Sequence, residues 1–469
     1  MFKTRQIPWA LASLSLSMLL SSLGTSIANV ALPTLALAFS ATFQQVQWVV
    51  LAYLLAITTL IVSVGRLGDI LGRRRLLLGG IALFTTASVL CAAAPSLAWL
   101  LAARATQGLG AATMMALTIA FVAETVPKAQ TGSAMGLLGT MSAVGTALGP
   151  SLGGVLIGGL GWRSIFLVNL PLGILAFLLA RHHLPADRQS RSTARFDAIG
   201  TLLLALSLAA YALAMTLGRG HFGTLNMALL LAAAIGTGLF VFSQTRVASP
   251  LLQLAAFRDP ALGASLATNV LVATVIMATF VVGPFYLSQS LGLSAARVGV
   301  VMAIGPAISI VGGVLAGRVV DRWGAASTVV VGLVAMAAGA VALAVLPILF
   351  GVVGYIAAIA ILTPGYQLFQ AANNTAVMLD VPADQRGVVS GLLSLSRNLG
   401  LVTGASVMGA VFAFAAGTTD ITTARPEAVA TGLQTTFGVA ALLVLAALAI
   451  TAMGQRRAET KKAPGQALF

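Results

Sequence analysis

The sequence predicts an all-α polytopic membrane protein, and three observations support that prediction. Hydrophobic residues make up 59% of the 469 residues, and charged residues make up only 8%. A soluble domain carries about 25% charged residues because its surface faces water, so most of this surface is expected to face lipid. Apolar stretches of membrane-spanning length recur along the whole chain, and two short motifs occur twice in the same order.

Fourteen apolar stretches are long enough to cross a bilayer as helices, which takes about 20 residues each. The first six cover residues 9–33, 47–64, 76–95, 98–119, 131–157 and 163–180. Two more cover 198–217 and 224–243, and the last six cover 262–285, 297–316, 326–347, 349–372, 387–415 and 430–452. The even number places both termini on the same side of the membrane.

The basic residues predict which side that is. Twenty of the 26 lysines and arginines lie on one side, four lie in loops on the other side, and two lie inside spans. Lysine and arginine are concentrated in cytoplasmic loops, so we expect a plasma (inner) membrane protein with both termini in the cytoplasm. The net charge of +15 is therefore interpreted as a topology signal, and the lipid bilayer rather than nucleic acid is the expected partner.

Internal repeats predict two homologous halves. The stretch at 65–72 (GRLGDILG) recurs at 317–324 (GRVVDRWG), 252 residues later, and the stretch that begins at Val126 recurs from Val381, 255 residues later. Transporters with such halves rock them around a central site. The expected domains are an N-terminal six-helix bundle (1–180), a basic cytoplasmic loop with two extra transmembrane helices (181–250), a C-terminal six-helix bundle (251–453) and a cytoplasmic tail (454–469). The two extra helices have no counterpart in the repeat, so we expect them outside the central pathway.

The repeated glycine motif is predicted to gate this pathway on the cytoplasmic side. Its glycines let neighbouring helix ends approach closely, and its aspartate can pair with an arginine or with a helix N-terminus. The alternative is a solvated turn that only carries topology-setting arginines. The residues concerned are Gly65, Asp69, Gly72 and Arg73 in the first copy and Gly317, Asp321 and Gly324 in the second.

Four segments resemble the major facilitator superfamily, and specifically its fourteen-helix drug:proton antiporter branch. They are the loop at 65–75, residues 104–112 of the fourth helix, residues 145–154 of the fifth helix, and residues 162–171 at the start of the sixth. The resemblance implies the major facilitator fold, with two six-helix bundles plus two additional transmembrane helices. It also implies a secondary exporter of small amphiphilic compounds, of the multidrug efflux type, that works by alternating access.

The fifth-helix segment carries the inference that transport is outward. Pro150 removes a backbone donor and bends the helix, while Gly145, Gly149, Gly153 and Gly154 permit close packing. By resemblance, such a helix marks antiporters that export their substrates. An ordinary kinked membrane helix is the alternative.

Two arginines, Arg104 and Arg397, lie well inside predicted spans, where an ionisable residue is costly and indicates function. The resemblance assigns Arg104 to proton coupling. Alternatively, its side chain snorkels to the interface or donates to carbonyl groups between helices. Arg397 either faces the cavity or pins helices together.

The first helix departs from the family pattern, since Gly24 stands where the family usually has an aspartate. All eleven acidic residues lie at span ends, in loops or in the tail, and Asp69, Glu124 and Asp197 are candidates for titration from the cytoplasmic rim. Protons are the expected coupled ion, but weak or absent coupling is an equal alternative. A second candidate function is an exporter or uniporter of a specific neutral or anionic metabolite. A sensor or scaffold is disfavoured because it needs no alternating access.

Polar, aromatic and methionine side chains inside the spans are candidates to line the substrate pathway, although any single polar one could instead form an interhelical hydrogen bond. The candidates are Asn29, Gln107, Asn269, Phe285, Tyr286, Gln289, Met302, Tyr366, Gln370 and Asn373. Metal-ligand spacings and activated nucleophiles are missing from the sequence, so we expect neither an enzyme nor a metal or cofactor. The phosphate loop of ATP-driven proteins is missing too, so we do not expect transport to be driven directly by ATP. The expected oligomeric state is a monomer.

Overall fold

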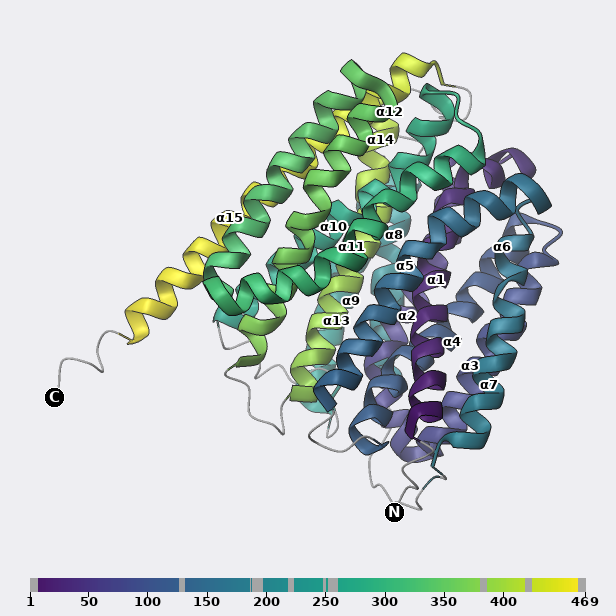
Figure 1. Ribbon diagram of the computed structural model, residues 1–469, viewed down its shortest axis with the longest axis vertical. Coiled ribbons are helices and arrows are strands. Elements are labelled where there is room, and N and C mark those ends of the chain that lie inside the picture. The colour runs from purple at the N-terminus through teal and green to yellow at the C-terminus, as the bar shows by residue number, and fades with distance from the viewer. Residues whose placement is uncertain are drawn as a thin grey trace.

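The computed structural model describes residues 7–125, 131–185, 187, 197–217, 223–247, 250–251, 260–379, 386–417 and 424–462. Within these residues every regular element is a helix (Figure 1). Helices suit a bilayer because they satisfy every backbone N–H and C=O group within one segment. The all-α membrane fold predicted from composition is confirmed.

The helices fall into an N-terminal half, a pair in the middle and a C-terminal half. The N-terminal half comprises α1 (Ile7–Ala38), α2 (Phe43–Leu71), α3 (Arg73–Ala92), α4 (Leu97–Thr125), α5 (Thr131–Leu160), α6 (Ser164–Leu167) and α7 (Asn169–His183). The pair comprises α8 (Ala198–Thr216) and α9 (Thr224–Arg246). The C-terminal half comprises α10 (Pro260–Phe285), the π-helical turn η3 (Tyr286–Ser290), α11 (Ala295–Trp323), α12 (Ala325–Leu379), α13 (Arg386–Thr403), the π-helical turn η4 (Gly404–Met408), α14 (Gly409–Ala415) and α15 (Pro426–Lys462).

Twelve helices within the described ranges are long and apolar enough to cross a membrane. One of the twelve is α12, which is a hairpin of two arms because Gly351 interrupts it with a φ of +56°. The arms pack closely, since a Cβ atom at Gly339 would lie 2.6 Å from the Cα atom of Leu362. The helix α5 is 30 residues long and is not counted among the twelve; its stretch Val144–Leu160 is counted as a shorter apolar helix.

The glycines of α5 and α13 show the internal repeat in three dimensions. A Cβ atom at Gly145 of α5 would collide with the carbonyl oxygen of Leu19 on α1. Gly400 of α13 lies 255 residues later, and a Cβ atom there would collide with the carbonyl oxygen of Val270 on α10. Glycine permits this close approach of two helix backbones. Thus α5 packs on α1 in the same way as α13 packs on α10.

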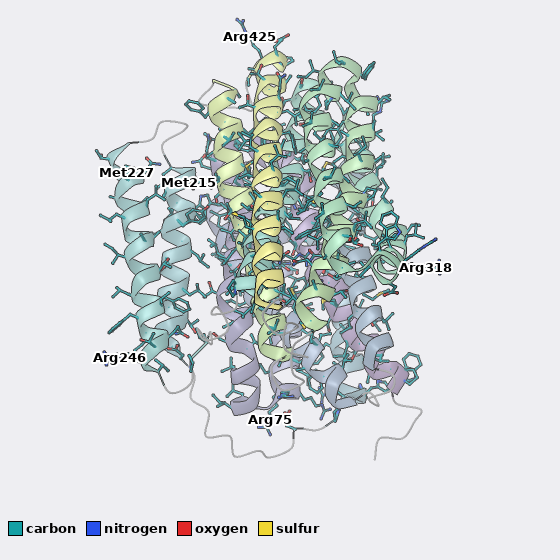
Figure 2. All side chains as sticks on the ribbon, turned by 90° about the vertical axis from the view of Figure 1, so that its left-hand side faces the viewer. Arg75, Met215, Met227, Arg246, Arg318 and Arg425 are labelled. Atoms are coloured by element: carbon teal, nitrogen blue, oxygen red, sulfur yellow. The ribbon has the colours of Figure 1, made fainter. Side chains whose placement is uncertain are left out.

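The helices α8 and α9 stand side by side on the flank of the bundle (Figure 2). The helix α8 touches both halves: Trp48 Nε1 on α2 donates to Thr216 Oγ1 over 3.0 Å, and Tyr211 Oη donates to Thr403 Oγ1 on α13 over 3.3 Å. The helix α9 lies farther out, since only four of its residues are buried: Asn226, Ala233, Phe240 and Gln244. The pair therefore covers the seam between the halves from outside.

The basic side chains mark two opposite ends of the molecule. Arg75 and Arg246 lie at one end, Arg425 lies at the other, and Arg318 lies on the flank between them (Figure 2). These are termed the Arg75 end and the Arg425 end below. The loops that contain Arg75 and Arg425 were predicted on opposite sides of the membrane, and the structure separates them in that way.

Candidate functional site

A cavity of about 300 Å³ lies between the two halves. Its wall comes from α1, α2, α4 and α5 on one side and from α10, α11, α12 and α13 on the other. No residue of α8 or α9, over the parts described, belongs to this wall, which is the arrangement expected of a pair outside the pathway. The volume lies at the lower end of the range of about 300–1,000 Å³ that small-molecule pockets occupy.

The wall of the cavity is mainly apolar. It contains three methionines, Met115, Met277 and Met302, together with the aromatic rings of Phe280 and Tyr355. Methionine is flexible and polarizable, so it adapts to ligands of different shape. Hydroxyl groups from α1 and α5 add neutral polar surface. The lining suits molecules that have both an apolar body and a few polar groups.

The charge of the cavity wall comes from one side chain. Arg397 is the only formally charged residue among the described residues that line the cavity, and no aspartate or glutamate is among them. The Nε atom of Arg397 is enclosed by protein and has no hydrogen-bond partner. The cavity therefore offers a positive group without a negative one.

Three contacts between the halves close the cavity at the Arg425 end. On α5, a Cβ atom at Gly154 would lie 2.7 Å from the Cα atom of Gly299 on α11. The ring of Phe43 at the start of α2 packs edge-on against Phe285 at the end of α10, with 4.7 Å between ring centres. The third contact is a hydrogen bond from Gln47 Nε2 to the carbonyl oxygen of Ala405 in η4, over 2.9 Å. Opening this end requires these contacts to separate.

Arg104 is fully buried inside the N-terminal half, away from the cavity wall. Its Nε donates to the Val49 carbonyl over 2.8 Å, its Nη2 to the Gly24 carbonyl over 3.1 Å, and its Nη1 to Gln107 Oε1 over 2.5 Å. Its guanidinium carbon lies 4.1 Å from the centre of the Tyr53 ring, which is a cation–π contact. Carbonyl oxygens and an aromatic ring thus hold this charge. The geometry matches the alternative of an arginine that donates to carbonyl groups between helices.

Tyr53 fills the space that a first-helix carboxylate would need. A Cβ atom at Gly24 would lie 2.8 Å from Tyr53 Oη and 3.2 Å from Cε2 of Phe84. The Tyr53 hydroxyl donates to the Ser21 carbonyl over 2.8 Å, which fixes α2 against α1. The missing aspartate is therefore accompanied by aromatic packing in its place. Nothing near Gly24 in the sequence indicates this partner, because Tyr53 belongs to another helix.

Four of the ten predicted cavity residues line the cavity: Asn29, Met302, Tyr366 and Gln370. Asn29 Nδ2 donates to the carbonyl oxygens of Thr25 and Ser26 in its own helix, but its Oδ1 has no partner. Gln370 Oε1 also has no partner. Both residues thus line the cavity, and each has an enclosed acceptor oxygen without a partner.

Three other polar candidates do not line this cavity, and two of them are hydrogen-bonded within their own half. Gln107 belongs to the Arg104 cluster, where its Nε2 donates to Ser88 Oγ over 2.7 Å. Asn269 of α10 ties this helix to α13, because its Nδ2 donates to Ser396 Oγ over 2.8 Å. Asn373 is buried outside the cavity wall, with its Nδ2 unpaired.

The candidates at the end of α10 are also not part of the cavity wall. Phe285 belongs to the closing contacts at the Arg425 end. Tyr286 is buried, and its hydroxyl donates to the carbonyl oxygen of Pro347 over 2.9 Å. Gln289 lies in η3, beyond the cavity. These residues lie at the end of α10, outside the lining of the cavity.

The structure gives Asp197 a local role. Its Oδ1 accepts from the Gly200 backbone N–H over 2.8 Å at the start of α8, and its Oδ2 accepts from Gln244 Nε2 of α9 over 2.7 Å. A carboxylate at this position satisfies free N–H groups of the first helical turn. Asp69 and Glu124 lie on α2 and α4, but their side chains lie outside the described residues, so their predicted coupling role stays a prediction.

The two copies of the glycine motif end in different surroundings. In the first copy, Gly72 has a φ of +93° between α2 and α3, and the backbone N–H groups of Arg74 and Arg75 donate to the Asp187 carboxylate over 2.7 and 3.2 Å. Asp187 comes from the basic loop after α7 and was not among the predicted site residues. Its one sequence signal is that it is an acid in a loop of arginines.

In the second copy, Gly324 has a φ of +80° between α11 and α12. Asp321 is exposed, and no heavy atom lies within 4 Å of a Cβ atom built at Gly317. The turn at Gly324 therefore exists without the close packing and the carboxylate cap of the first copy. Gly65 and Arg73 of the first copy lie near the end of α2 and at the start of α3.

The glycines predicted on α5 take part in two interfaces. A Cβ atom at Gly149 would collide with Ser26 on α1, and a Cβ atom at Gly153 would lie 2.7 Å from Cγ1 of Val30 on the same helix. Gly154 and the carbonyl group of Pro150 instead face Gly299 on α11. One side of α5 is therefore fixed within its own half, and the other side meets the opposite half.

Comparison with known proteins gives a consistent result for family and fold. The family model described as Major Facilitator Superfamily matches residues 14–405. The chain is 32% identical over 415 residues to the multidrug resistance protein Stp of Mycobacterium tuberculosis, which covers 86% of this chain and 75% of that protein. It is 31% identical over 394 residues to the riboflavin transporter RibZ of Clostridioides difficile, which covers 84% of this chain and 86% of that protein.

A solved structure agrees with the fold. The crystal structure of a bacterial homolog of the human lysosomal transporter Spinster, in an inward-facing and occupied conformation, superposes with a TM-score of 0.67 at 16% identity over 97% of this chain and 98% of that one. The chain belongs to the major facilitator superfamily, whose members are membrane transporters rather than enzymes.

Proposed function

We propose that this protein is a secondary exporter of small amphiphilic compounds, of the multidrug efflux type. The observation that carries the proposal is the central cavity, which has a lining of methionine, aromatic and neutral polar side chains from both halves. A lining of this kind accepts varied apolar bodies. The name of Stp, a multidrug resistance protein, supports the same class of substrate.

Alternating access is the proposed mechanism, and α5 is its moving contact. Gly145, Gly149 and Gly153 hold α5 on α1 inside one half, while Gly154 touches Gly299 of the other half. Rocking of the halves would separate Gly154 from Gly299 and leave the α1–α5 packing intact. The cavity would then lose its closure at the Arg425 end.

We assign the chain to the fourteen-helix branch with the Arg75 end in the cytoplasm. The twelve candidate spans include the whole of α12, and each arm of that hairpin is longer than the 20 or so residues that a span needs. Counting its arms separately and adding α5 gives fourteen. The excess of basic loops at the Arg75 end supports a cytoplasmic location of both termini in the plasma (inner) membrane, and we propose a monomer.

Protons are the proposed coupled ion, with weak coupling. Arg104 cannot change its charge, because a guanidinium stays protonated in proteins, and no described residue of the cavity wall is a carboxylate. A change of charge during transport would have to come from the rim, where Asp69 and Glu124 are the remaining candidates.

Dye transport in inside-out vesicles tests the proposal. Vesicles containing the protein should accumulate amphiphilic dyes, and an imposed pH gradient should change the rate only modestly. The control is Gly154→Leu at the same protein level, which should hold the halves apart and stop transport. Accumulation no higher than in this control, for every dye of a panel of different charges, would contradict the proposal.

A second candidate, the exporter or uniporter of one neutral or anionic metabolite, is favoured by a specific observation. Asn29 and Gln370 line the cavity with enclosed oxygens that have no partner, and a rotation of either side chain would let its oxygen recognise a defined donor on a ligand. The relative RibZ is named a riboflavin transporter, which is an example of such a substrate. Competition among unrelated dyes separates the two: mutual inhibition supports the multidrug function, and transport of a single compound supports the metabolite function.

A further inference from the structure

We infer that Arg397 is an anion-binding residue of the central cavity, and that the transported compounds carry an anionic group such as a carboxylate, sulfonate or phosphate. This inference rests on the proposed function, because it names the class of compound that the same cavity takes. It assigns a ligand role to a side chain that the mechanism of rocking halves does not use.

The first argument is the state of the guanidinium group. Arg397 has five N–H donors and no acceptor, its Nε is enclosed without a partner, and no acidic residue is part of the described cavity wall. Burial of a charge is costly unless a partner compensates it. An anionic ligand would supply that partner, with the two-pronged geometry in which a guanidinium binds a carboxylate or phosphate.

The second argument is the position of Arg397 on α13. Its neighbour Ser396 accepts a hydrogen bond from Asn269 of α10, and Gly400 packs on the backbone of α10. Successive helical residues are about 100° apart, so Arg397 lies to one side of the face that packs on α10, on the side of the cavity that it lines. A residue that pinned helices together would have partners, and Arg397 Nε has none.

The internal repeat supports the same position. Ser142 of α5 lies 255 residues before Arg397, at the same offset that relates Gly145 to Gly400. Ser142 also lines the cavity, where its hydroxyl lies 2.7 Å from that of Ser22. The two halves therefore present equivalent positions to the cavity, with a hydroxyl in one half and a guanidinium in the other.

The rest of the cavity wall specifies the remainder of the ligand. Met277, Met302 and Phe280 offer apolar surface to its body. The oxygens of Asn29 and Gln370 are enclosed and unpaired, and after rotation of these side chains they would accept hydrogen bonds from its N–H or O–H groups. The ligand class is thus an amphiphilic anion with at least one hydrogen-bond donor. A cation of the same shape would be repelled by Arg397 and would find no carboxylate to bind.

A matched pair of probes tests the inference: 7-aminocoumarin-3-carboxylate and its carboxamide, which have the same ring and the same amino donor. Binding to the full-length protein in lipid nanodiscs is measured by calorimetry, with empty nanodiscs as the blank. A charge-assisted hydrogen bond predicts that the carboxylate binds about ten- to hundredfold more tightly than the carboxamide. In Arg397→Gln this ratio should fall to about one, while the affinity for the carboxamide stays within about twofold.

Two further variants complete the test. Arg397→Lys keeps the charge but loses the planar fork, so its ratio should be intermediate. Arg425→Gln removes an exposed arginine at the far end of the molecule (Figure 2) and should keep the wild-type ratio. The ratio of the two probe affinities in the wild-type protein tests the inference even if Arg397→Gln does not fold. In that case Arg397→Lys replaces it as the variant to compare.

Equal affinity of the wild-type protein for both probes, or an unchanged ratio in Arg397→Gln, would overturn the inference. So would a failure of the carboxylate to bind at millimolar concentration. Dye transport, measured separately in vesicles, would then show whether the proposed export function still holds without a preference for anions. Absence of transport for every dye would instead refute the export function itself.

Discussion

Arg104 and Arg397 both lie inside predicted membrane spans, but the protein surrounds them in opposite ways. In the N-terminal half, Arg104 donates to the carbonyl groups of Gly24 and Val49 and to Gln107, and it lies over an aromatic ring. In the C-terminal half, Arg397 lines a cavity with its Nε unpaired. An arginine within a membrane span therefore does not identify a binding site by itself. Whether its donors already have acceptors decides between a structural and a ligand-binding role.

The surroundings of the first helix explain part of this difference. Gly24 has no side chain, so Tyr53 can pack against α1 beside the carbonyl group that accepts from Arg104. Backbone carbonyls have two lone pairs, so they can accept from a guanidinium in addition to their helical N–H. In the described part of the C-terminal half, Arg397 Nε has no carbonyl oxygen as a hydrogen-bond partner, so we infer that its charge is left for a ligand.

The largest expected effect separates the two arginines by stability. Arg104→Gln removes hydrogen bonds from a charged group to two buried carbonyls, and we expect it to lower the free energy of unfolding by about 2 to 5 kcal/mol. Arg397→Gln breaks no described hydrogen bond of Nε and should change it by less than about 1 kcal/mol. Thermal unfolding of both purified variants in the same detergent measures the difference. Equal losses of stability in both variants would contradict the distinction between the two arginines, because Arg397 would then be structural too.

A second prediction concerns the contact that closes the cavity around Arg397. Gly154→Leu places a side chain against Gly299 of the other half and should lower the transport rate by about tenfold or more, since the halves could no longer approach. Gly159→Leu on the same helix is the matched control, because no atom lies within 4 Å of a Cβ atom built there. Its transport rate should stay within about twofold of wild type. Equal rates in both variants would show that transport does not require the close approach of α5 and α11 at Gly154.

The sequence predicted the fold more fully than the site. Composition and the lengths of apolar stretches suffice for an all-helical membrane protein, and the glycines of the fifth-helix segment, Gly145 and Gly149, were predicted as packing positions. It was harder to predict whether a given side chain points toward the cavity, toward a neighbouring helix or toward lipid. Asn269 and Phe285 lie in one span, α10, that is apolar on every side, so no polar face indicates which of its residues turn toward the cavity.

Partners from distant parts of the chain were also beyond prediction. Tyr53 contacts Arg104 from another helix, and Asp187 reaches the start of α3 from a loop more than a hundred residues later. Each contact depends on how the helices are arranged in space. Local propensity and short motifs contain no information on such pairs.

A third prediction gives Arg104 the carboxylate that the first helix lacks. Gly24→Asp alone would collide with the Tyr53 hydroxyl, so the variant to make is Gly24→Asp with Tyr53→Phe. A carboxylate can gain and lose a proton, whereas a guanidinium cannot. The double variant should therefore increase the effect of an imposed pH gradient on dye transport by about threefold and should favour cationic dyes. Tyr53→Phe alone is the control.

A measurement on the wild-type protein could contradict this third prediction. Tight proton-coupled export of cationic dyes that survives neutralising Asp69, Glu124 and Asp197 one at a time would show that coupling needs neither a first-helix carboxylate nor these rim acids. Arg104 would then act in coupling without any titratable partner among the predicted residues. The contrast between a structural Arg104 and a ligand-binding Arg397 would be lost.

The smallest expected effect extends the comparison of the two halves to their glycine motifs. Asp187→Ala removes the carboxylate that accepts from Arg74 and Arg75 at the start of α3, and loss of such a cap costs about 0.5 to 2 kcal/mol. Asp321→Ala in the second copy removes an exposed side chain and should leave the unfolding temperature unchanged. Thermal unfolding measures both, and vesicle transport at equal protein level shows whether the loss also slows turnover. A slower turnover with Asp187→Ala alone would mean that the first loop gates the pathway and that Asp187 holds the start of α3 in the position that gating needs. Unchanged unfolding temperatures in both variants would mean instead that the first copy, like the second, is a solvated turn, since a carboxylate that anchors α3 cannot be removed without loss of stability.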